Sequence, residues 1–315
     1  MKQQQFEADN QPLWDQIAAI INGSDGGSVN LPPRYRRLCQ CLALARQRGY
    51  SPALTDYLQQ LVSDCHRLMY GASAARPNTL VQWMLIDFPQ RVRAEWRLLL
   101  TACIAFFGVG GAVALLVWFD PNLAYSFSSP EELAKYRAMY APDMQRLGRG
   151  GSEGDFQMFG HYIWNNISID FRTFALGILG AIPAVFIMGY NGLLLGVVGS
   201  WLSQDPATTH TFWSFVVTHA SFEVVGMLLS GVAGMKLGLA LIRPGRRTRA
   251  LALQEASQYM FPVLVGAALM TFLAAFIEAF WSASPAVPVM VKYVVGALCW
   301  LSIILFFTFA GRGRN

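Results

Sequence analysis

Hydrophobic residues gather in long runs in the C-terminal two-thirds of this chain. The runs cover residues 98–119, 162–185, 186–203, 212–241, 259–281 and 289–310. A helix needs about 20 apolar residues to cross the hydrocarbon core of a membrane. The pattern therefore predicts an all-α, polytopic membrane protein with about six transmembrane helices.

The boundary between the second and third runs carries only a weak signal. Residues 173–202 contain no charge and no polar loop. Asn191-Gly192 is a turn signal, and a break there would leave 193–203 too short to cross. We therefore expect a broken helix near Asn191, with residues 186–203 either spanning fully or re-entrant.

The first 95 residues instead place apolar positions at the spacing of short amphipathic helices. Ser51 predicts a helix N-cap with Pro52 in the first turn, and Leu54, Leu58 and Leu61 follow along one stripe. The polar N-terminus has no short apolar stretch of the kind found in signal peptides, so none is expected. We predict a cytoplasmic helical domain at 1–95, a first transmembrane helix at 96–119, an extracytoplasmic loop at 120–160, and a bundle with about five further spans at 161–311.

The distribution of basic residues predicts the orientation in the membrane. They gather before the first run, after the fourth run and after the last run, at Arg91, Arg93, Arg97, Arg243, Arg246, Arg247, Arg249, Arg312 and Arg314. Positively charged loops stay in the cytoplasm. Residues 120–160 hold six acidic residues against four basic ones, as expected on the outside. We therefore expect a multi-pass protein of the bacterial inner membrane with both termini in the cytoplasm.

Composition agrees with a membrane location. The chain has 315 residues, of which 54% are hydrophobic and 14% charged, and its mean hydropathy is +0.36. Soluble domains carry about 25% charged residues. The net charge of +5 follows the predicted topology. A nucleic-acid-binding protein would need its basic residues clustered on a soluble module, so we expect no nucleic acid partner.

Several polar side chains fall inside the apolar runs, where each ionisable group costs about 2.5–3.5 kcal/mol on insertion scales. His219 and Glu223 lie four residues apart and share one helical face. With Glu278 they are expected to meet in one intramembrane polar site, whose other members are Asn166, Asp170, Arg172 and Asn191. Three carboxyl groups against one arginine require protonation, a cation or a water-filled cavity. A purely structural polar cluster that holds the helices in register remains the alternative.

Metal and cofactor sites are not expected. Cys39 and Cys41 point about 200° apart on a helix, so they do not chelate one ion with Cys65 and His66. The sequence HExxH is absent, and a single histidine at 219 makes a sparse zinc site. We expect no catalytic residues and no metal, although an intramembrane metallohydrolase using His219, Glu223 and Glu278 stays open as a lesser alternative.

Small residues recur at four-residue spacing at Gly192 and Gly196 and again at Gly234 and Gly238. This spacing lets helix backbones approach closely. The glycines are expected to pack helices within one chain or to join two chains as a C2 homodimer.

The ordered motifs "NNISIDFRTFALG", "YNGLLLG", "HASFE", "GVAGMKLG" and "AAFIEAFW" resemble the stage II sporulation protein M family of multispanning membrane proteins, most closely its members outside spore formers. The resemblance covers roughly residues 80–310. It places the family's His-Gly-x-x-Glu motif on His219 and Glu223, its Asn-Gly on Asn191 and Gly192, and its later membrane glutamate on Glu278. Ala220 stands where the family usually has glycine.

The resemblance implies a membrane scaffold, because the family member of spore formers holds a peptidoglycan-degrading enzyme and a partner protein. We therefore expect a membrane assembly component, not an enzyme, that contacts the lipid bilayer and protein partners in the membrane or periplasm. The alternative is an ion or small-solute transporter or channel, since buried charge and broken helices are typical of such sites. A soluble-ligand sensor that uses loop 120–160 has no supporting motif.

The topology can be tested by labelling single cysteines in intact cells. A cysteine introduced at Ser152 should react with a membrane-impermeant thiol reagent, because residues 120–160 are expected outside. A cysteine at Thr248 is the matched control and should react only after the cells are opened. Protection at 152 together with labelling at 248 would invert the topology.

Overall fold

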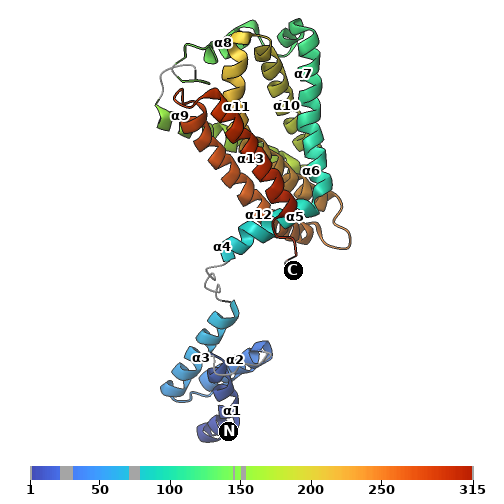
Figure 1. The fold of residues 1–315 in the computed structure, drawn as a ribbon. Helices are drawn as coiled ribbons and strands as arrows, with labels where there is room; N and C mark the ends of the chain where they lie inside the picture. The colour runs from blue at the N-terminus through green and yellow to red at the C-terminus, as the bar shows by residue number, and fades with distance from the viewer. Residues whose placement is uncertain (1, 22–30, 71–78, 145, 150–153, 314–315) are drawn as a thin grey trace. The chain divides into compact units, whose positions relative to one another are not determined.

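The structure, a computed structural model, describes residues 2–21, 31–70, 79–144, 146–149 and 154–313. It divides into two compact units, Met1–Thr79 and Leu80–Asn315 (Figure 1). All regular elements within the described ranges are helical, as the sequence predicts. Ser152 and Arg314, on which the topology prediction draws, fall outside these ranges.

The first unit is a bundle of three helices, α1 (Gln3–Ile21), α2 (Leu31–Gln47) and α3 (Pro52–Tyr70). Its core consists of apolar side chains from all three, among them Phe6, Trp14, Ile17, Leu38, Leu42, Leu58 and Cys65. The predicted cap is present, since the backbone N–H of Leu54 donates to Oγ of Ser51 at 3.4 Å. All five cysteines of the chain are free thiols.

The predicted domain boundary at residue 95 is not where the compact units divide. Residues 80–95 belong to the second unit, because their polar side chains bind backbone oxygens near the end of the last helix. Arg93 donates to the carbonyl oxygens of Phe307 and Ala310 at 2.9 and 2.8 Å. Gln90 donates to that of Gly311 at 2.8 Å. The amphipathic pattern continued across this boundary and did not reveal it.

The second unit is a bundle of long helices with short irregular pieces (Figure 1). In chain order its elements are α4 (Thr79–Gln82), the π-helix η1 (Trp83–Asp87), α5 (Phe88–Ala94), α6 (Trp96–Cys103), the π-helix η2 (Ile104–Gly108), α7 (Val109–Phe119), the 3-10 helix η3 (Pro121–Ser126), α8 (Pro130–Met139), α9 (Asp155–Ile178), α10 (Ile182–Ser203), α11 (Pro206–Ile242), α12 (Arg249–Phe276), the π-helix η4 (Ile277–Ser282) and α13 (Val289–Phe309).

Five helical segments of the described chain are long and apolar enough to cross a membrane, by length and composition alone. They are Trp96–Phe119, Ile182–Ser203, Pro206–Ile242, Arg249–Ser282 and Val289–Phe309. Helix α9 is not among them, although six spans were predicted. Its range, Asp155–Ile178, also begins and ends earlier than the predicted run 162–185.

The predicted break at Asn191 is wrong. Helix α10 runs through this residue, whose side-chain amide donates to the carbonyl of Ile187 one turn earlier at 2.9 Å. The chain turns instead at Gly180 and Ala181, where φ is +127° and +64°. Glycine adopts such angles readily, whereas alanine rarely does. Because no polar residues mark this turn in the sequence, its position could not be predicted from hydropathy.

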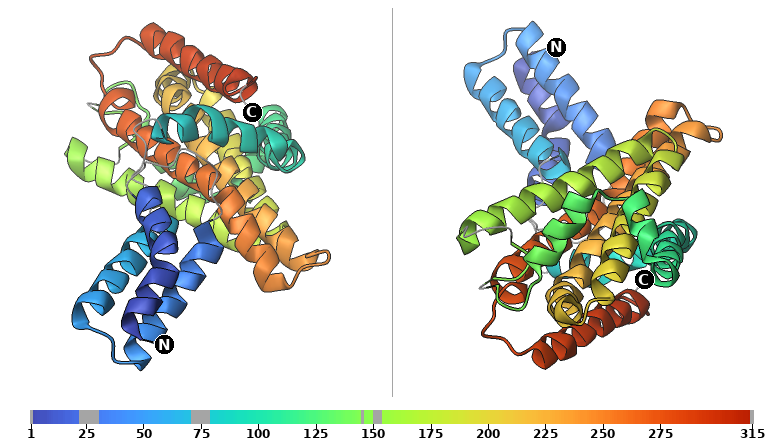
Figure 2. Two further views of the ribbon diagram at one scale, coloured as in Figure 1. Left: turned by 90° about the horizontal axis from the view of Figure 1, so that it is seen from below. Right: turned by 90° about the horizontal axis from the view of Figure 1, so that it is seen from above.

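Helix α9 packs against α10, α11, α12 and η4, and its polar residues Asn166 and Asp170 are buried. Its beginning packs on η4, where Tyr162 lies against Ala279. Its end packs on the last turns of α11, where a Cβ on Gly177 would lie 2.6 Å from the carbonyl carbon of Gly234. Because α11 and α12 are consecutive and pack side by side, η4 and the end of α11 mark opposite ends of the bundle (Figure 2). Helix α9 is therefore part of the bundle, although it lacks the apolar composition of the five candidate spans.

The predicted glycines pack helices within the chain. A Cβ on Gly192 would lie 2.1 Å from the carbonyl oxygen of Phe106, and one on Gly196 would lie 2.3 Å from that of Gly110. Gly234 and Gly238 meet α9 in the same way, 2.2 Å from the carbonyl oxygens of Phe174 and Gly177. These faces are therefore filled by neighbouring helices, and the idea that they join two chains is wrong. Dimerisation by another surface stays a prediction.

Two adjacent glycines of α7 test the packing. Gly110→Ala should destabilise the protein by about 1–3 kcal/mol, because the new Cβ would lie 2.6 Å from the backbone oxygen of Gly192. Gly111→Ala should keep or raise stability, since a Cβ there meets nothing within 4 Å and alanine is the better helix former. The measurement is the melting temperature of the wild-type protein and both variants, purified in the same detergent. Equal shifts of the melting temperature in the two variants would contradict this packing.

Candidate functional site

A cavity of about 840 Å³ lies among helices α9, α10, α11 and η4. Side chains of α8 and of the segment after it line one part, where Lys135, Tyr136, Tyr140 and Gly148 lie. Asn191 of α10 and Met227 of α11 line other parts. The polar lining also includes five residues that the sequence predicted, Asn166, Asp170, His219, Glu223 and Glu278, together with Gln157, His161, Tyr162 and Asn165 of α9.

Helix α11 supplies His219 and Glu223. The helix starts at Pro206 after Asp205, whose carboxylate accepts from the backbone N–H of Ala207 at 3.0 Å. The four-residue spacing puts both side chains on one face, and Nε2 of His219 lies 3.9 Å from Oε2 of Glu223. His219 is buried, whereas the side chain of Glu223 keeps 31% of its surface accessible, on the cavity.

Glu278 approaches the same point from the π-helix η4 at the end of α12. Single π-turns are rare and are frequent at functional sites. Glu278 and Ser282 are both buried in this short segment. Oγ of Ser282 lies 3.0 Å from Nδ1 of His219. One nitrogen of His219 and one carboxylate oxygen each from Glu223 and Glu278 all lie within 4.8 Å of one another.

Helix α9 completes the polar wall with two buried residues, one helical turn apart. The amide of Asn166 donates to Oε2 of Glu278 at 3.4 Å. The hydroxyl of Thr271 on α12 donates to Oδ2 of Asp170 at 2.5 Å. These hydrogen bonds connect α9 to α12 and η4, and they leave both carboxyl groups at the cavity.

Arg172 was predicted in this group, and the structure places it elsewhere. Its side chain is exposed on the outer side of α9. Two residues correspond to about 200° of rotation on a helix, so Arg172 and Asp170 point to opposite sides. Asn191 lines the cavity, but its amide is bonded within α10.

Two buried basic residues near the site were not predicted. Arg149 donates to Oδ1 of Asp155 and to the carbonyl oxygen of Ala279, each at 2.7 Å. Lys292 donates to the carbonyl oxygen of Ser282 at 2.7 Å. Lys292 lies inside a predicted span and could have been found there, whereas Arg149 was counted only as part of a loop. Both hold the backbone of η4.

The lining of the cavity is acidic. Three carboxyl groups, Asp170, Glu223 and Glu278, face it, and Lys135 is the one lysine or arginine among its lining residues. Tyr140 contacts Phe212 and Phe215 of α11 at the part of the cavity next to α8. Burial raises the pKa of Tyr140, and the charge of Glu278 acts in the same direction, so this hydroxyl stays neutral. The cavity therefore favours a cation over an anion.

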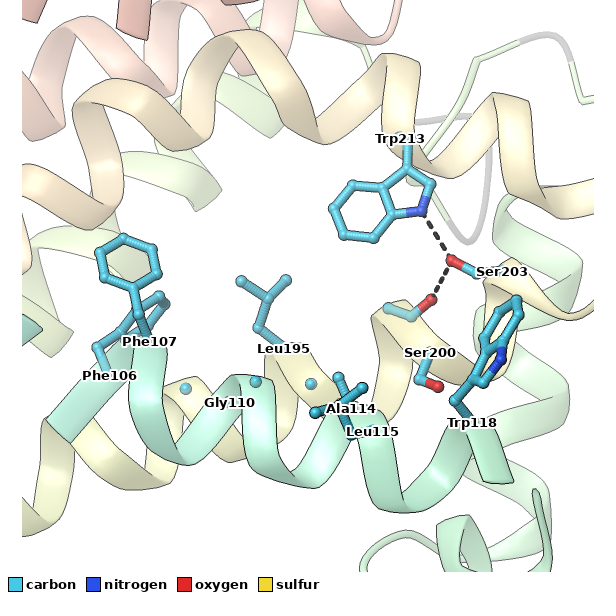
Figure 3. A pocket seen from close by; sticks show the side chains of 14 residues that line it. Phe106, Phe107, Gly110, Ala114, Leu115, Trp118, Leu195, Ser200, Ser203 and Trp213 are labelled. Atoms are coloured by element: carbon cyan, nitrogen blue, oxygen red, sulfur yellow. Dashed lines mark hydrogen bonds between the residues drawn. The ribbon is translucent and has the colours of Figure 1, made fainter. Parts of the chain in front are cut away.

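A second pocket, of about 530 Å³, is lined mainly by apolar side chains (Figure 3). It lies along the glycine contact between α7 and α10, with Trp213 of α11 beside it. The indole of Trp213 donates to Oγ of Ser203 at 2.7 Å, and that hydroxyl donates to the carbonyl of Gly199. Phe106 and Leu195 line both pockets and form a shared wall.

Two family models match the chain. A family model described as Stage II sporulation protein M matches residues 101–283, more than half of the chain. This range contains His219, Glu223 and Glu278. A model described as a domain of unknown function (DUF8413) matches residues 4–71, which cover most of the first unit. Curated proteins and solved structures give no match.

Two arginines that share Asp155 test how the segment before α9 is held. Arg149→Ala should lower the free energy of unfolding by about 1–3 kcal/mol, because the carbonyl of Ala279 loses a buried charged donor. Arg146→Ala should cost less than about 1 kcal/mol, since the side chain of Arg146 is 39% accessible and its ion pair with Oδ2 of Asp155, at 3.0 Å, is screened by solvent. Thermal melting of both variants measures these losses of stability. An equal loss in the two variants would contradict the view that Arg149 holds this segment more firmly than Arg146 does.

Proposed function

The chain belongs to the stage II sporulation protein M family, and we propose that this member moves a small cation or cationic solute across the membrane through its acidic cavity. The supporting observation is the convergence of Asp170, Glu223 and Glu278 on one cavity inside the helical bundle. Ionisable groups at membrane depth usually mark ion or proton pathways. The proposal is one of transport, without a catalytic step.

Charge balance favours this function over a structural cluster. A structural cluster would pair its charges and fill its volume, because an unpaired buried charge is strongly destabilising. Here Glu223 remains accessible to a cavity of about 840 Å³. A bound cation or a proton would neutralise the excess negative charge of the carboxylates, as expected where an ion or proton passes through a membrane protein.

Irregular helices support the same function. Phe106 in η2 and Glu278 in η4 both line the cavity from π-helical segments. Transporters commonly build their sites from interrupted helices near the middle of the membrane. Beyond Asp170, helices α9 and α11 are in close contact at Gly177 and Gly234, which closes the cavity toward that end. Transport would require these helices to separate there.

The predicted orientation would place the cavity on the outer side of the bacterial inner membrane. The segment between α7 and α9, which was expected to be extracytoplasmic, lines the cavity through Lys135, Tyr140 and Gly148. With both termini in the cytoplasm, a solute would then enter from outside.

An assembly component is the second candidate, as the family resemblance implied. The observation that favours it is the first unit, which has a core of its own and matches a separate family model. Such a module offers a surface for a partner without disturbing the bundle. Protein partners in the membrane or periplasm, and a homodimer, remain predictions of this alternative.

Transport can be tested with the full chain in proteoliposomes. Uptake of Na⁺, K⁺, protons, Mg²⁺ and Zn²⁺ should reveal at least one cation whose flux exceeds that of protein-free vesicles. Glu223→Gln and Glu278→Gln should each reduce this flux at least about tenfold, because they remove charge and keep shape. Glu131→Gln is the control, since Glu131 is exposed in the first turn of α8.

Melting temperatures of the same preparations separate function from stability. Loss of flux with an unchanged melting temperature supports transport. Parallel losses of flux and stability would make the carboxyl groups structural. Absence of flux for every cation, with partners that co-purify with the full chain and not with residues 80–315, would favour the assembly component.

A further inference from the structure

We propose that His219, Glu223 and Glu278 bind one divalent transition-metal ion, of which Zn²⁺ is the reference, at the wall of the cavity. The inference rests on the proposed function only for passage of the metal, because binding is a property of the three residues themselves. It departs from the expectation that the chain binds no metal. That expectation relied on the absence of HExxH and on the presence of a single histidine, and it kept these three residues open only as the site of a less favoured metallohydrolase.

The geometry of the ligand atoms carries the inference. All three lie within 4.8 Å of one another, with His219 and Glu223 separated by 3.9 Å. Two ligands of tetrahedral Zn²⁺, each about 2.1 Å from the metal, lie about 3.4 Å apart. Small rotations of two glutamate side chains would therefore complete the site. Zinc sites that exchange a ligand have three protein ligands and leave the fourth position open. The three residues proposed here would leave that position open to the cavity.

The orientation of His219 is a second and independent indication. Metal-binding histidines usually donate the proton of one ring nitrogen to an outer partner, and this leaves the other nitrogen free for the metal. Nδ1 of His219 lies 3.0 Å from Oγ of Ser282, while Nε2 is directed at Glu223. Ser282 is completely buried, and the ammonium of Lys292 binds its carbonyl oxygen at 2.7 Å. The ring is thus held by a fixed partner.

The donor set selects among cations. Mg²⁺ prefers six oxygen ligands in an octahedron, whereas imidazole favours zinc and its neighbours in the first transition series. Two carboxylates balance the charge of a divalent ion, so the loaded site would be close to neutral within the membrane. Asn166 donates to Oε2 of Glu278, which leaves the other oxygen of that carboxylate to bind the ion. A monovalent cation would leave one negative charge uncompensated.

Metal binding can be measured on the purified full chain in detergent, with any affinity tag removed. Titration with Zn²⁺ should give one ion per chain and raise the melting temperature. X-ray absorption of the zinc form should fit one imidazole with carboxylate oxygens at about 2.0–2.1 Å. Mn²⁺ should bind more weakly than Zn²⁺, and Mg²⁺ and Na⁺ should not compete at a hundredfold excess.

Matched variants assign the ligands. His219→Ala, Glu223→Gln and Glu278→Gln should each weaken Zn²⁺ binding at least about a hundredfold. Ser282→Ala should weaken it about ten- to a hundredfold by releasing the ring. His161→Ala is the control, because His161 lines the same cavity outside the proposed ligand set and should leave affinity unchanged.

Several results would overturn the site. These are zinc that stays bound in His219→Ala, an absorption spectrum without imidazole in the wild-type protein, or Mg²⁺ bound as tightly as Zn²⁺. The spectrum of the wild-type protein decides the matter even where a variant fails to fold. Specific binding of Zn²⁺ without flux of any cation would keep the metal site and reject transport. Flux of Na⁺ or protons without specific Zn²⁺ binding would keep transport and reject the metal site.

Discussion

Carboxyl groups placed within a membrane must be shielded from hydrocarbon, and this requirement organises the second unit. Asp170, Glu223 and Glu278 come from three segments far apart in the chain, and all three face one cavity. Helix α9 shows the consequence most clearly. Its aromatic residues Phe156, Trp164 and Phe171 are exposed on the outside, while Asn166 and Asp170 are buried. This arrangement reverses that of a helix in a soluble protein, because here the outside is the apolar phase.

Glycine contacts make such an enclosure possible. Where α9 crosses α11, and where α7 crosses α10, backbones touch without intervening side chains. The same two helices are in close contact at Gly177 and Gly234 and line the cavity with Asn166, Asp170, His219 and Glu223. Van der Waals packing, hydrogen bonds between helices and lipid entropy drive helix association in lipid, since burial of apolar surface gains little there. The glycine contacts therefore hold together the same helices that form the walls of the cavity.

The sequence predicts the parts of this structure that depend on periodicity. Hydrophobic runs predicted five of the long helices, and four-residue spacing predicted that His219 and Glu223 share one helical face. The turn at Gly180 and Ala181 was missed because a change of backbone direction within apolar sequence has no compositional signal. Arg172 was misplaced because a list of charged residues ignores the angle between positions 170 and 172. Arg149 and Ser282 could be found only once tertiary contacts brought them to η4 and His219.

The π-helix η4 explains how the last member of the site reaches the others. Widening the helix by one residue in this turn changes the direction of every side chain that follows relative to a regular α-helix. Both Glu278 and Ser282 are buried next to α11, where a carboxylate oxygen of Glu278 lies within 4.8 Å of a ring nitrogen of His219 and Oγ of Ser282 lies 3.0 Å from its Nδ1. The backbone of this turn is held from two sides, by Arg149 at Ala279 and by Lys292 at Ser282. Two buried cations fixing one irregular turn next to a histidine indicate that the position of this turn matters more than the regularity of the helix.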